Sequence, residues 1–276
     1  MQKPLRDELD GCFRTPHDGP PKWLAMLTLY LDESGHQGKG WTFVAGFLGN
    51  DEQWGKFVPA WKNALGKQRK NLHMNDLRWG KDYTRQLLEK LAPIPEECGL
   101  QGVMGGVCYE HYEDLIVGTP DEKLLKGYMA ALHPMMTQIF RGIPKNERLE
   151  IVFEQQREYQ KWVDISIPFY ALPHPQMPWL HMEDGQSKLA KWSFVPKNTS
   201  VMTDPADYLA FALREAWTDS TSKKAQWCKP LLATGKGEGI GVVLTKEMVR
   251  RAVRSSQLMA MYQDLDMSLK KLGVSK

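Results

Sequence analysis

Two apolar runs near the start of the chain predict the first strands of the fold. Trp23 to Leu31 is almost unbroken in apolar residues, as expected of a strand buried on both faces. Trp41 to Leu48 is a second β-rich run, closed by the turn residues Gly49 and Asn50. Because only a Gly-rich link separates the two runs, we expect them to pair as an antiparallel hairpin.

Apolar residues recur at helical spacing in several later segments. Asp51 to Gly66 predicts a helix capped by Asp51, with Pro59 as a point of kinking or restart. Four prolines between Pro168 and Pro178 predict a loop of the kind that often forms a lid. Further helices are expected at Lys81 to Ala92, Asp121 to Phe140, Thr203 to about Trp217 and Thr245 to Lys271, strands at Leu100 to Tyr109 and Arg148 to Phe153, and a short apolar run at Trp192 to Val195.

The order of these elements indicates the fold class and the domain organisation. A hairpin followed by alternating helices and strands is typical of an α/β fold with a mixed sheet. Residues 1–22 are rich in Gly, Pro and charge and predict an irregular N-terminal arm. We expect one domain over residues 23–218 and a C-terminal extension over residues 219–276, whose arginine-rich helix packs on that domain.

Composition is that of an ordinary globular protein, with 276 residues, 42% hydrophobic and 25% charged. The apolar runs are too short to cross a bilayer and the first residues lack a signal-peptide layout, so we expect a cytoplasmic protein without a membrane partner. The formal charge of +3 permits polyanion binding without requiring it. No C-x-x-C pair occurs, which excludes the usual zinc spacing; the cysteines are Cys12, Cys98, Cys108 and Cys228.

Carboxylates stand at the ends of apolar elements in three separate places. Asp32 and Glu33 end the first predicted strand, and Glu154 follows the strand that ends at Phe153. Asp207 lies on a helix that is apolar nearly all round, so its side chain is expected to face packed structure. Ligands gather at strand ends in open α/β sheets. Each position also has an ordinary interpretation, as a solvated turn, the first solvated residue after a strand, or a helix-dipole partner.

His73 and Asp76 lie three residues apart in the basic loop Lys67 to Trp79, a spacing that lets both side chains point one way if the loop turns helically. A lone His–Asp pair is a weak signal. The alternative is that Asn75 or Asp76 caps the next helix while His73 packs nearby.

Three other features receive structural interpretations. Asp204 precedes Pro205 at the start of a helix and is interpreted as its N-cap. The Gly-rich segment Gly235 to Gly241 lacks the Lys-Ser/Thr of a phosphate loop and is interpreted as a hairpin turn. Lys197 is either a partner for a substrate phosphate or a solvated side chain, and the second interpretation is preferred.

In combination, the motifs resemble those of the bacterial and phage family called domain of unknown function 3800. They are Tyr-Leu-Asp-Glu-Ser-Gly, Gly-Phe-Leu on the second strand, His-x-x-Asp and a late Ala-Asp-Tyr-Leu-Ala helix, over roughly residues 24–217. The resemblance implies a ribonuclease H-like mixed sheet flanked by helices, and a metal-dependent nuclease. Two departures stand out, because Glu154 replaces the family's usual Asp and Asp204 its usual Gln.

Ribonuclease H-like sites use three or four carboxylates to hold two Mg²⁺ or Mn²⁺ ions on the scissile phosphate of DNA or RNA. The resemblance implies that Asp32, Glu154 and Asp207 hold the metal, and that the catalytic set is Asp32, Glu33, Glu154, Asp207, His73 and Asp76. We expect His73 and Asp76 beside the phosphate rather than as main metal anchors. Two alternatives remain, a non-catalytic nucleic-acid or protein-binding module and a hydrolase or transferase acting on a small phosphate compound in a closed pocket under the proline-rich loop.

Overall fold

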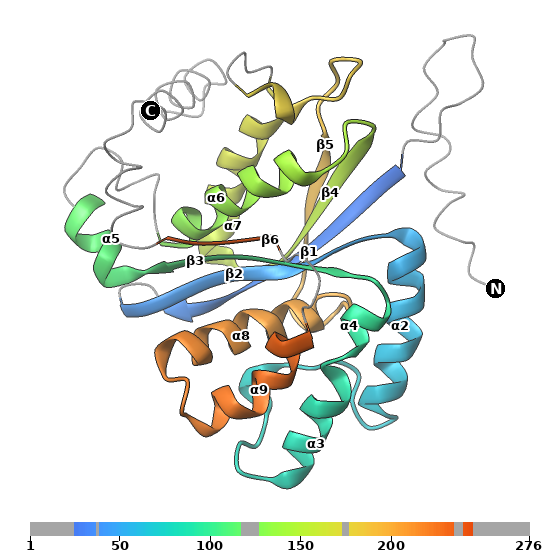
Figure 1. Cartoon of the computed structure of the whole chain (residues 1–276), viewed down its shortest axis with the longest axis vertical. Helices are drawn as coiled ribbons and strands as arrows, with labels where there is room; N and C mark the ends of the chain where they lie inside the picture. The colour runs from blue at the N-terminus through green and yellow to red at the C-terminus, as the bar shows by residue number, and fades with distance from the viewer. Residues whose placement is uncertain (1–24, 37–38, 117–126, 173–176, 235–239, 245–276) are drawn as a thin grey trace.

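A six-stranded mixed sheet forms the centre of the computed structural model, which describes residues 25–36, 39–116, 127–172, 177–234 and 240–244 (Figure 1). The sheet order is β5-β4-β1-β2-β3-β6. The predicted α/β class with a mixed sheet is confirmed. The strands are β1 Ala25–His36, β2 Lys39–Asn50, β3 Gln101–Cys108, β4 Glu147–Glu154, β5 Leu189–Val195 and β6 Ile240–Leu244.

Helices cover both faces of this sheet (Figure 1). One face carries α6 and α7, and the other carries α2, α3, α8 and α9. The α-helices are α2 Asp51–Leu65, α3 Asp82–Leu91, α4 Ile94–Glu97, α5 Tyr109–Ile116, α6 Gly127–Gly142, α7 Arg157–Ser166, α8 Asp204–Thr218 and α9 Lys223–Thr234. Short 3₁₀ helices are η1 Met74–Asp76, η3 Ile167–Ala171 and η4 Pro178–Leu180.

The central strand β1 forms the predicted antiparallel hairpin with β2 and runs parallel to β4 on its other side. It does not stop at Leu31 as expected. Asp32, Glu33 and Ser34 continue the ladder opposite Ala45, Val44 and Phe43, so the acidic pair lies within a strand. The interpretation of these residues as a solvated turn is therefore wrong, because their backbone groups are used by β2.

Alternation of side chains along β1 builds two separate cores. Leu29 and Leu31 are fully buried in the core beneath α6. Tyr30 points the other way and meets the Trp54 ring of α2 with ring centroids 4.7 Å apart. Successive strand residues point to opposite faces, so even-numbered positions of β1 face α8. This alternation decides which face receives Asp32.

The N-cap of α2 is Asn50 rather than Asp51. The Asn50 side chain accepts from the Gln53 amide at 3.0 Å, and Gln53 Oε1 accepts from the Asn50 amide at 2.8 Å, which is a capping box. The helix continues through Pro59 without restarting. Pro59 and Gly55, whose carbonyl loses its helical partner, are both exposed, so water can satisfy that carbonyl.

The C-terminal extension contributes to the sheet. Its helix α9 packs on α8 and α3, and β6 pairs in parallel with β3 at the sheet edge. Residues 235–239 of the predicted hairpin turn lie outside the described residues, whereas Ile240 and Gly241 begin β6. The predicted arm and the arginine-rich helix after residue 244 also lie outside the described residues.

Candidate active site

Asp32, Glu33, Glu154 and Asp207 gather where the parallel pairing of β1 with β4 ends. Parallel pairing sets Leu31 of β1 beside Phe153 of β4, so Asp32 and Glu154 follow at the same level. Both point away from the α6 core and towards α8, whose first turn carries Asp207. The exposed fractions are 4% for Asp32, 7% for Glu154 and 8% for Asp207. We call these four residues the carboxylate cluster.

Burial and repulsion between like charges raise the pKa of Asp32, Glu33 and Glu154. The pKa of Asp32 lies well above its usual range, first because of burial and then because of Glu33, Asp207 and Glu154. Burial also raises the pKa of Glu33 to about 8, although Lys197 opposes the shift. The pKa of Glu154 is raised by burial, again against Lys197. Such a cluster favours the uptake of protons or cations, because ionised carboxylates repel one another in a poorly hydrated site.

Glu154 has an unsatisfied oxygen. Its Oε2 atom is buried and has no hydrogen-bond partner, and the Lys197 ammonium stands 3.8 Å from it, beyond hydrogen-bond distance. Lys197 follows β5 and its side chain is 43% exposed, against 6% for that of Glu154. The pair therefore spans the boundary between the buried cluster and solvent. The next residue, Asn198, has a left-handed backbone with φ 59°, and its backbone hydrogen bond lowers the pKa of Glu154.

Asp207 ties the basic loop to the cluster. Its Oδ2 atom accepts a hydrogen bond from the Met74 amide at 2.8 Å and lies 2.9 Å from His73 Nδ1. A carboxylate oxygen accepts, so Nδ1 is the protonated nitrogen of the ring. The hydrogen bond with Asp207 raises the pKa of His73, while partial burial opposes that shift.

Asp76 stands beside His73 rather than within the cluster. It lies in η1, its side chain is exposed, and its charge contributes to the raised pKa of His73. The helix-cap alternative is wrong, because the N-cap position of α3 is Lys81 and no side chain caps it. The catalytic roles assigned to His73 and Asp76 stay predictions.

The structure places Asp204 in a role that the sequence did not suggest. The N-cap of α8 is Thr203, without a side-chain cap bond, so the interpretation of Asp204 as the cap is wrong. Asp204 Oδ2 instead accepts from Trp61 Nε1 at 3.0 Å and from the Leu72 amide at 2.8 Å. Burial raises the pKa of Asp204 to about 7, although both of these hydrogen bonds oppose the shift. The available signal was the all-round apolar character of α8, which requires an acid in its first turn to face protein.

The oxygen ligands of the cluster are those that a hard cation prefers, but the side chains are not spaced as a metal-binding group. Carboxylate oxygens are the ligands that Mg²⁺ and Mn²⁺ prefer, and Glu154 offers a buried oxygen without a partner. Among the described residues, however, no three His, Cys, Asp or Glu side chains stand close enough together to form a metal-binding group.

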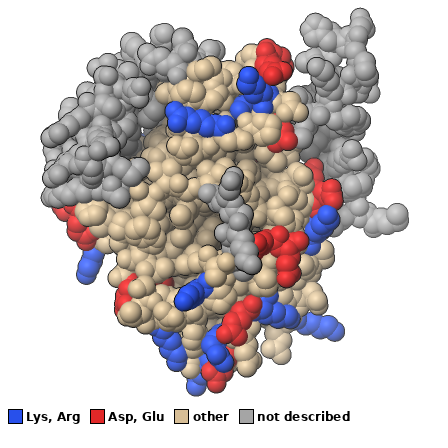
Figure 2. Space-filling view, viewed as in Figure 1, with Lys and Arg blue, Asp and Glu red and all other residues tan. Residues whose placement is uncertain are grey.

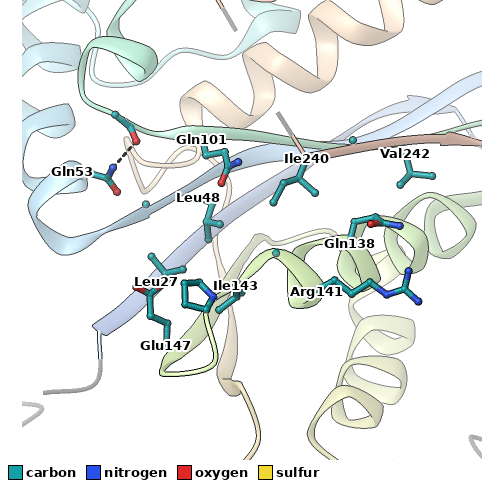
Figure 3. A pocket seen from close by; sticks show the side chains of 15 residues that line it. Leu27, Leu48, Gln53, Gln101, Gln138, Arg141, Ile143, Glu147, Ile240 and Val242 are labelled. Atoms are coloured by element: carbon teal, nitrogen blue, oxygen red, sulfur yellow. Dashed lines mark hydrogen bonds between the residues drawn. The ribbon is translucent and has the colours of Figure 1, made fainter. Parts of the chain in front are cut away.

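A cavity of about 800 Å³ lies at the other end of the sheet (Figure 3). Leu27, five residues before Asp32 on β1, contributes to its wall, as do Gln138 and Arg141 of α6. Of the proline-rich segment, the described residues 168–172, 177 and 178 do not line this cavity, and residues 173–176 lie outside the described residues. In Figure 3, Gln53 binds the Gly99 carbonyl at 2.6 Å beside the cavity.

The distribution of charged side chains in Figure 2 is relevant to the predicted nucleic-acid partner. On the face drawn there, described basic and acidic side chains are interspersed around the rim, and they form no continuous basic patch. Within the described part of the chain, no helix is both long and apolar enough to span a bilayer.

Two comparisons of the chain with known proteins found no match. No protein-family model matches the chain, and no curated protein matches it. The family resemblance rests on the short motifs themselves.

Proposed function

We propose that this protein is a divalent-metal-dependent nuclease of ribonuclease H-like architecture that hydrolyses phosphodiester bonds of DNA or RNA in the cytoplasm. The observation that carries the proposal is the buried carboxylate cluster, in which Asp32, Glu33 and Glu154 have raised pKa values. Strongly perturbed acids from separate elements at strand ends are typical of functional sites. A mixed sheet with a central hairpin and helices on both faces is compatible with the architecture.

Asp32, Glu154 and Asp207 are the residues that would hold the metal, with Glu33 as a fourth carboxylate. Bound there, Mg²⁺ or Mn²⁺ would supply a nucleophilic water and neutralise charge on the phosphate and the leaving oxygen. The rigid part of the site is Asp207, since its Oδ2 already accepts from Met74 and His73. Glu154 is the adaptable part, because its Oε2 has no competing hydrogen bond.

His73 is placed to handle a proton next to the cluster. Its Nδ1 is engaged by Asp207, so Nε2 is the ring nitrogen that would exchange a proton with the substrate. The orienting carboxylate favours the protonated ring, and a protonated imidazole can donate to a phosphate oxygen or to the leaving group. Asp76 supports this role by its negative charge near the ring.

Lys197 is placed to meet the substrate phosphate. Its ammonium stands on the solvent side of Glu154 and is less buried than the carboxylate beside it. A lysine at such a boundary can bind a phosphate oxygen as that oxygen approaches the acids. We prefer this role to the interpretation of Lys197 as a merely solvated side chain, because Lys197 lowers the pKa of both Glu33 and Glu154.

The test is cleavage of end-labelled single- and double-stranded DNA and RNA with Mg²⁺, Mn²⁺ or a chelator. We expect cleavage of at least one substrate that requires the cation and disappears in Asp32→Asn. Asp82→Asn is the matched control, because Asp82 is an exposed acid at the start of α3. Cleavage that persists in Asp32→Asn, or that needs no divalent cation, contradicts the proposal.

A non-catalytic binding module is the second candidate. The absence of a three-residue metal group among the described side chains favours it, as does Glu154 at the position where the resembled family carries Asp. Titration of Mn²⁺ into the protein, followed by electron paramagnetic resonance, separates the two candidates. Saturable binding that is lost in Asp32→Asn supports the nuclease, whereas nucleic-acid binding without cation binding or cleavage supports the module.

A further inference from the structure

The first turn of α8 holds the backbone on both sides of His73. Asp204 Oδ2 accepts from the Leu72 amide and Asp207 Oδ2 accepts from the Met74 amide, each at 2.8 Å. His73 between them has an extended backbone with φ −132° and ψ 119°. In an extended chain, amides two residues apart point the same way, and residues three apart on a helix share one face. We call this pair of hydrogen bonds the α8 clamp.

Asp204 is itself held in place from a third element. Its Oδ2 atom also accepts from the indole nitrogen of Trp61, a fully buried residue of α2. Asp204 is 3% exposed, so bulk solvent hardly reaches it. One oxygen therefore links α2, the His73 loop and α8, and its position is determined by packed structure.

The two ends of the clamp differ in what they do. Asp207 belongs to the carboxylate cluster and also bonds the His73 ring. The hydrogen bonds of Asp204 go instead to the Trp61 indole and to the Leu72 amide, one residue before His73. A loop held only at Asp207 can rotate about that anchor, whereas a second anchor at Leu72 fixes the direction in which His73 leaves the backbone.

We propose that Asp204 is a positioning residue that keeps the His73 loop aligned on Asp207 through the Leu72 hydrogen bond. Its effect on turnover rests on the proposed nuclease function, but the alignment itself does not. The competing explanation is that Asp204 only satisfies Trp61 in the core. That explanation predicts a loss of global stability without a particular effect on the loop.

Amide hydrogen exchange of Met74, measured by NMR without metal or substrate, tests the alignment. The partner of this amide is Asp207, so Asp204 variants leave that acceptor intact. In Asp204→Ala we expect Met74 exchange to accelerate by roughly 10- to 100-fold, while amides in the middle of β1 keep their protection. Asp204→Asn should retain most of the protection, because its side-chain oxygen can still accept.

Trp61→Phe is the matched control, because it removes the indole donor but leaves the Leu72 bond to Asp204. We expect lower thermal stability with unchanged Met74 protection relative to β1. In the cleavage assay, Asp204→Ala should lower kcat by about 10- to 100-fold with little change in KM, since misplacing a catalytic group costs rate. If Asp204→Ala does not fold, Asp204→Ser is held to the same criteria, because its shorter hydroxyl cannot reach both donors.

The outcomes separate this inference from the proposed function. Unchanged Met74 exchange in a folded Asp204→Ala protein overturns the inference, and so does equal loss of protection in Trp61→Phe or in Asp204→Asn. Failure of the wild-type protein to cleave any substrate overturns the nuclease proposal alone. Faster Met74 exchange limited to Asp204→Ala or Asp204→Ser supports the clamp in either case.

Discussion

The two ends of strand β1 differ in what they bury. At one end, Leu27 borders a cavity of about 800 Å³, and Arg141 and Glu147 are the charged residues among its described lining. At the other, Asp32, Glu154 and Asp207 are buried beside one another, and the pKa of Asp32 and of Glu33 is strongly raised. A cavity that is not lined by buried like charges does not by itself indicate a catalytic site. Buried like charges, in contrast, carry a free-energy cost that a bound cation would offset. We therefore assign the chemistry to the carboxylate end.

The largest expected effect comes from neutralising one acid at that end. Asp32→Asn should lower cleavage by more than about 100-fold, because even the outer partners of metal ligands contribute roughly 10- to 100-fold. It should also leave the fold intact, since Asn keeps the volume and removes a repelling charge. The measurements are initial rates at saturating Mg²⁺ together with Tm.

Glu147→Gln is the matched control for this comparison, because Glu147 lies at the cavity end of β4. Its cleavage rate should equal that of the wild-type protein. Comparable losses in Glu147→Gln and Asp32→Asn would remove the distinction between the two ends.

A smaller effect is expected at His73. His73→Ala should reduce turnover by about 100-fold, the lower range for general acid–base groups, while Mn²⁺ affinity changes by less than about threefold. The reason is that His73 contacts the cluster only through Asp207. Single-turnover rates and Mn²⁺ titrations measure the two quantities. A matching loss of Mn²⁺ affinity would make His73 a metal ligand instead.

Stability should depend on pH through Asp204. Its pKa rises from 3.8 in the unfolded chain to about 7 in the fold, so the protonated form is favoured by folding. That contribution is complete below the lower pKa and is lost as pH rises towards 7. Asp204→Asn should remove this part of the decline, a difference on the order of several degrees in Tm at pH 8. Parallel Tm curves for the two proteins between pH 4 and 8 would contradict the assignment.

The smallest effect is expected for a substitution at the cavity end of the sheet. Arg141→Ala removes a cation that packs over the Trp179 ring, 4.3 Å from its centroid. We expect a loss of stability of about 1 kcal/mol or less, and no change in cleavage or Mn²⁺ affinity. A cleavage defect in this variant would show that the cavity end takes part in the reaction.

Much of the architecture could be predicted from local pattern. The β1–β2 hairpin and helix α8 follow from apolar periodicity and flanking turn residues, which act over a few positions. The same reasoning placed Asp32, Glu154 and Asp207 at the ends of apolar elements. Parallel pairing of β1 with β4 then places Asp32 next to Glu154 across the two strands. The sequence shows that each residue ends an apolar run, but it does not show which strands are neighbours.

Only the tertiary structure decided what several polar residues do. Asp204 resembles a helix cap in sequence, yet its partners are Trp61 and Leu72, more than 130 residues away. Asp32 and Glu33 resemble a turn, yet β2 extends their strand. Local patterns report propensities that act within a turn or two of chain, whereas the partner of a buried carboxylate is set by which distant donors packing brings to it. The sequence therefore indicated that Asp207 would face packed structure, and the packing of α8 against the His73 loop decided that Asp204 and Asp207 both bind the backbone beside His73.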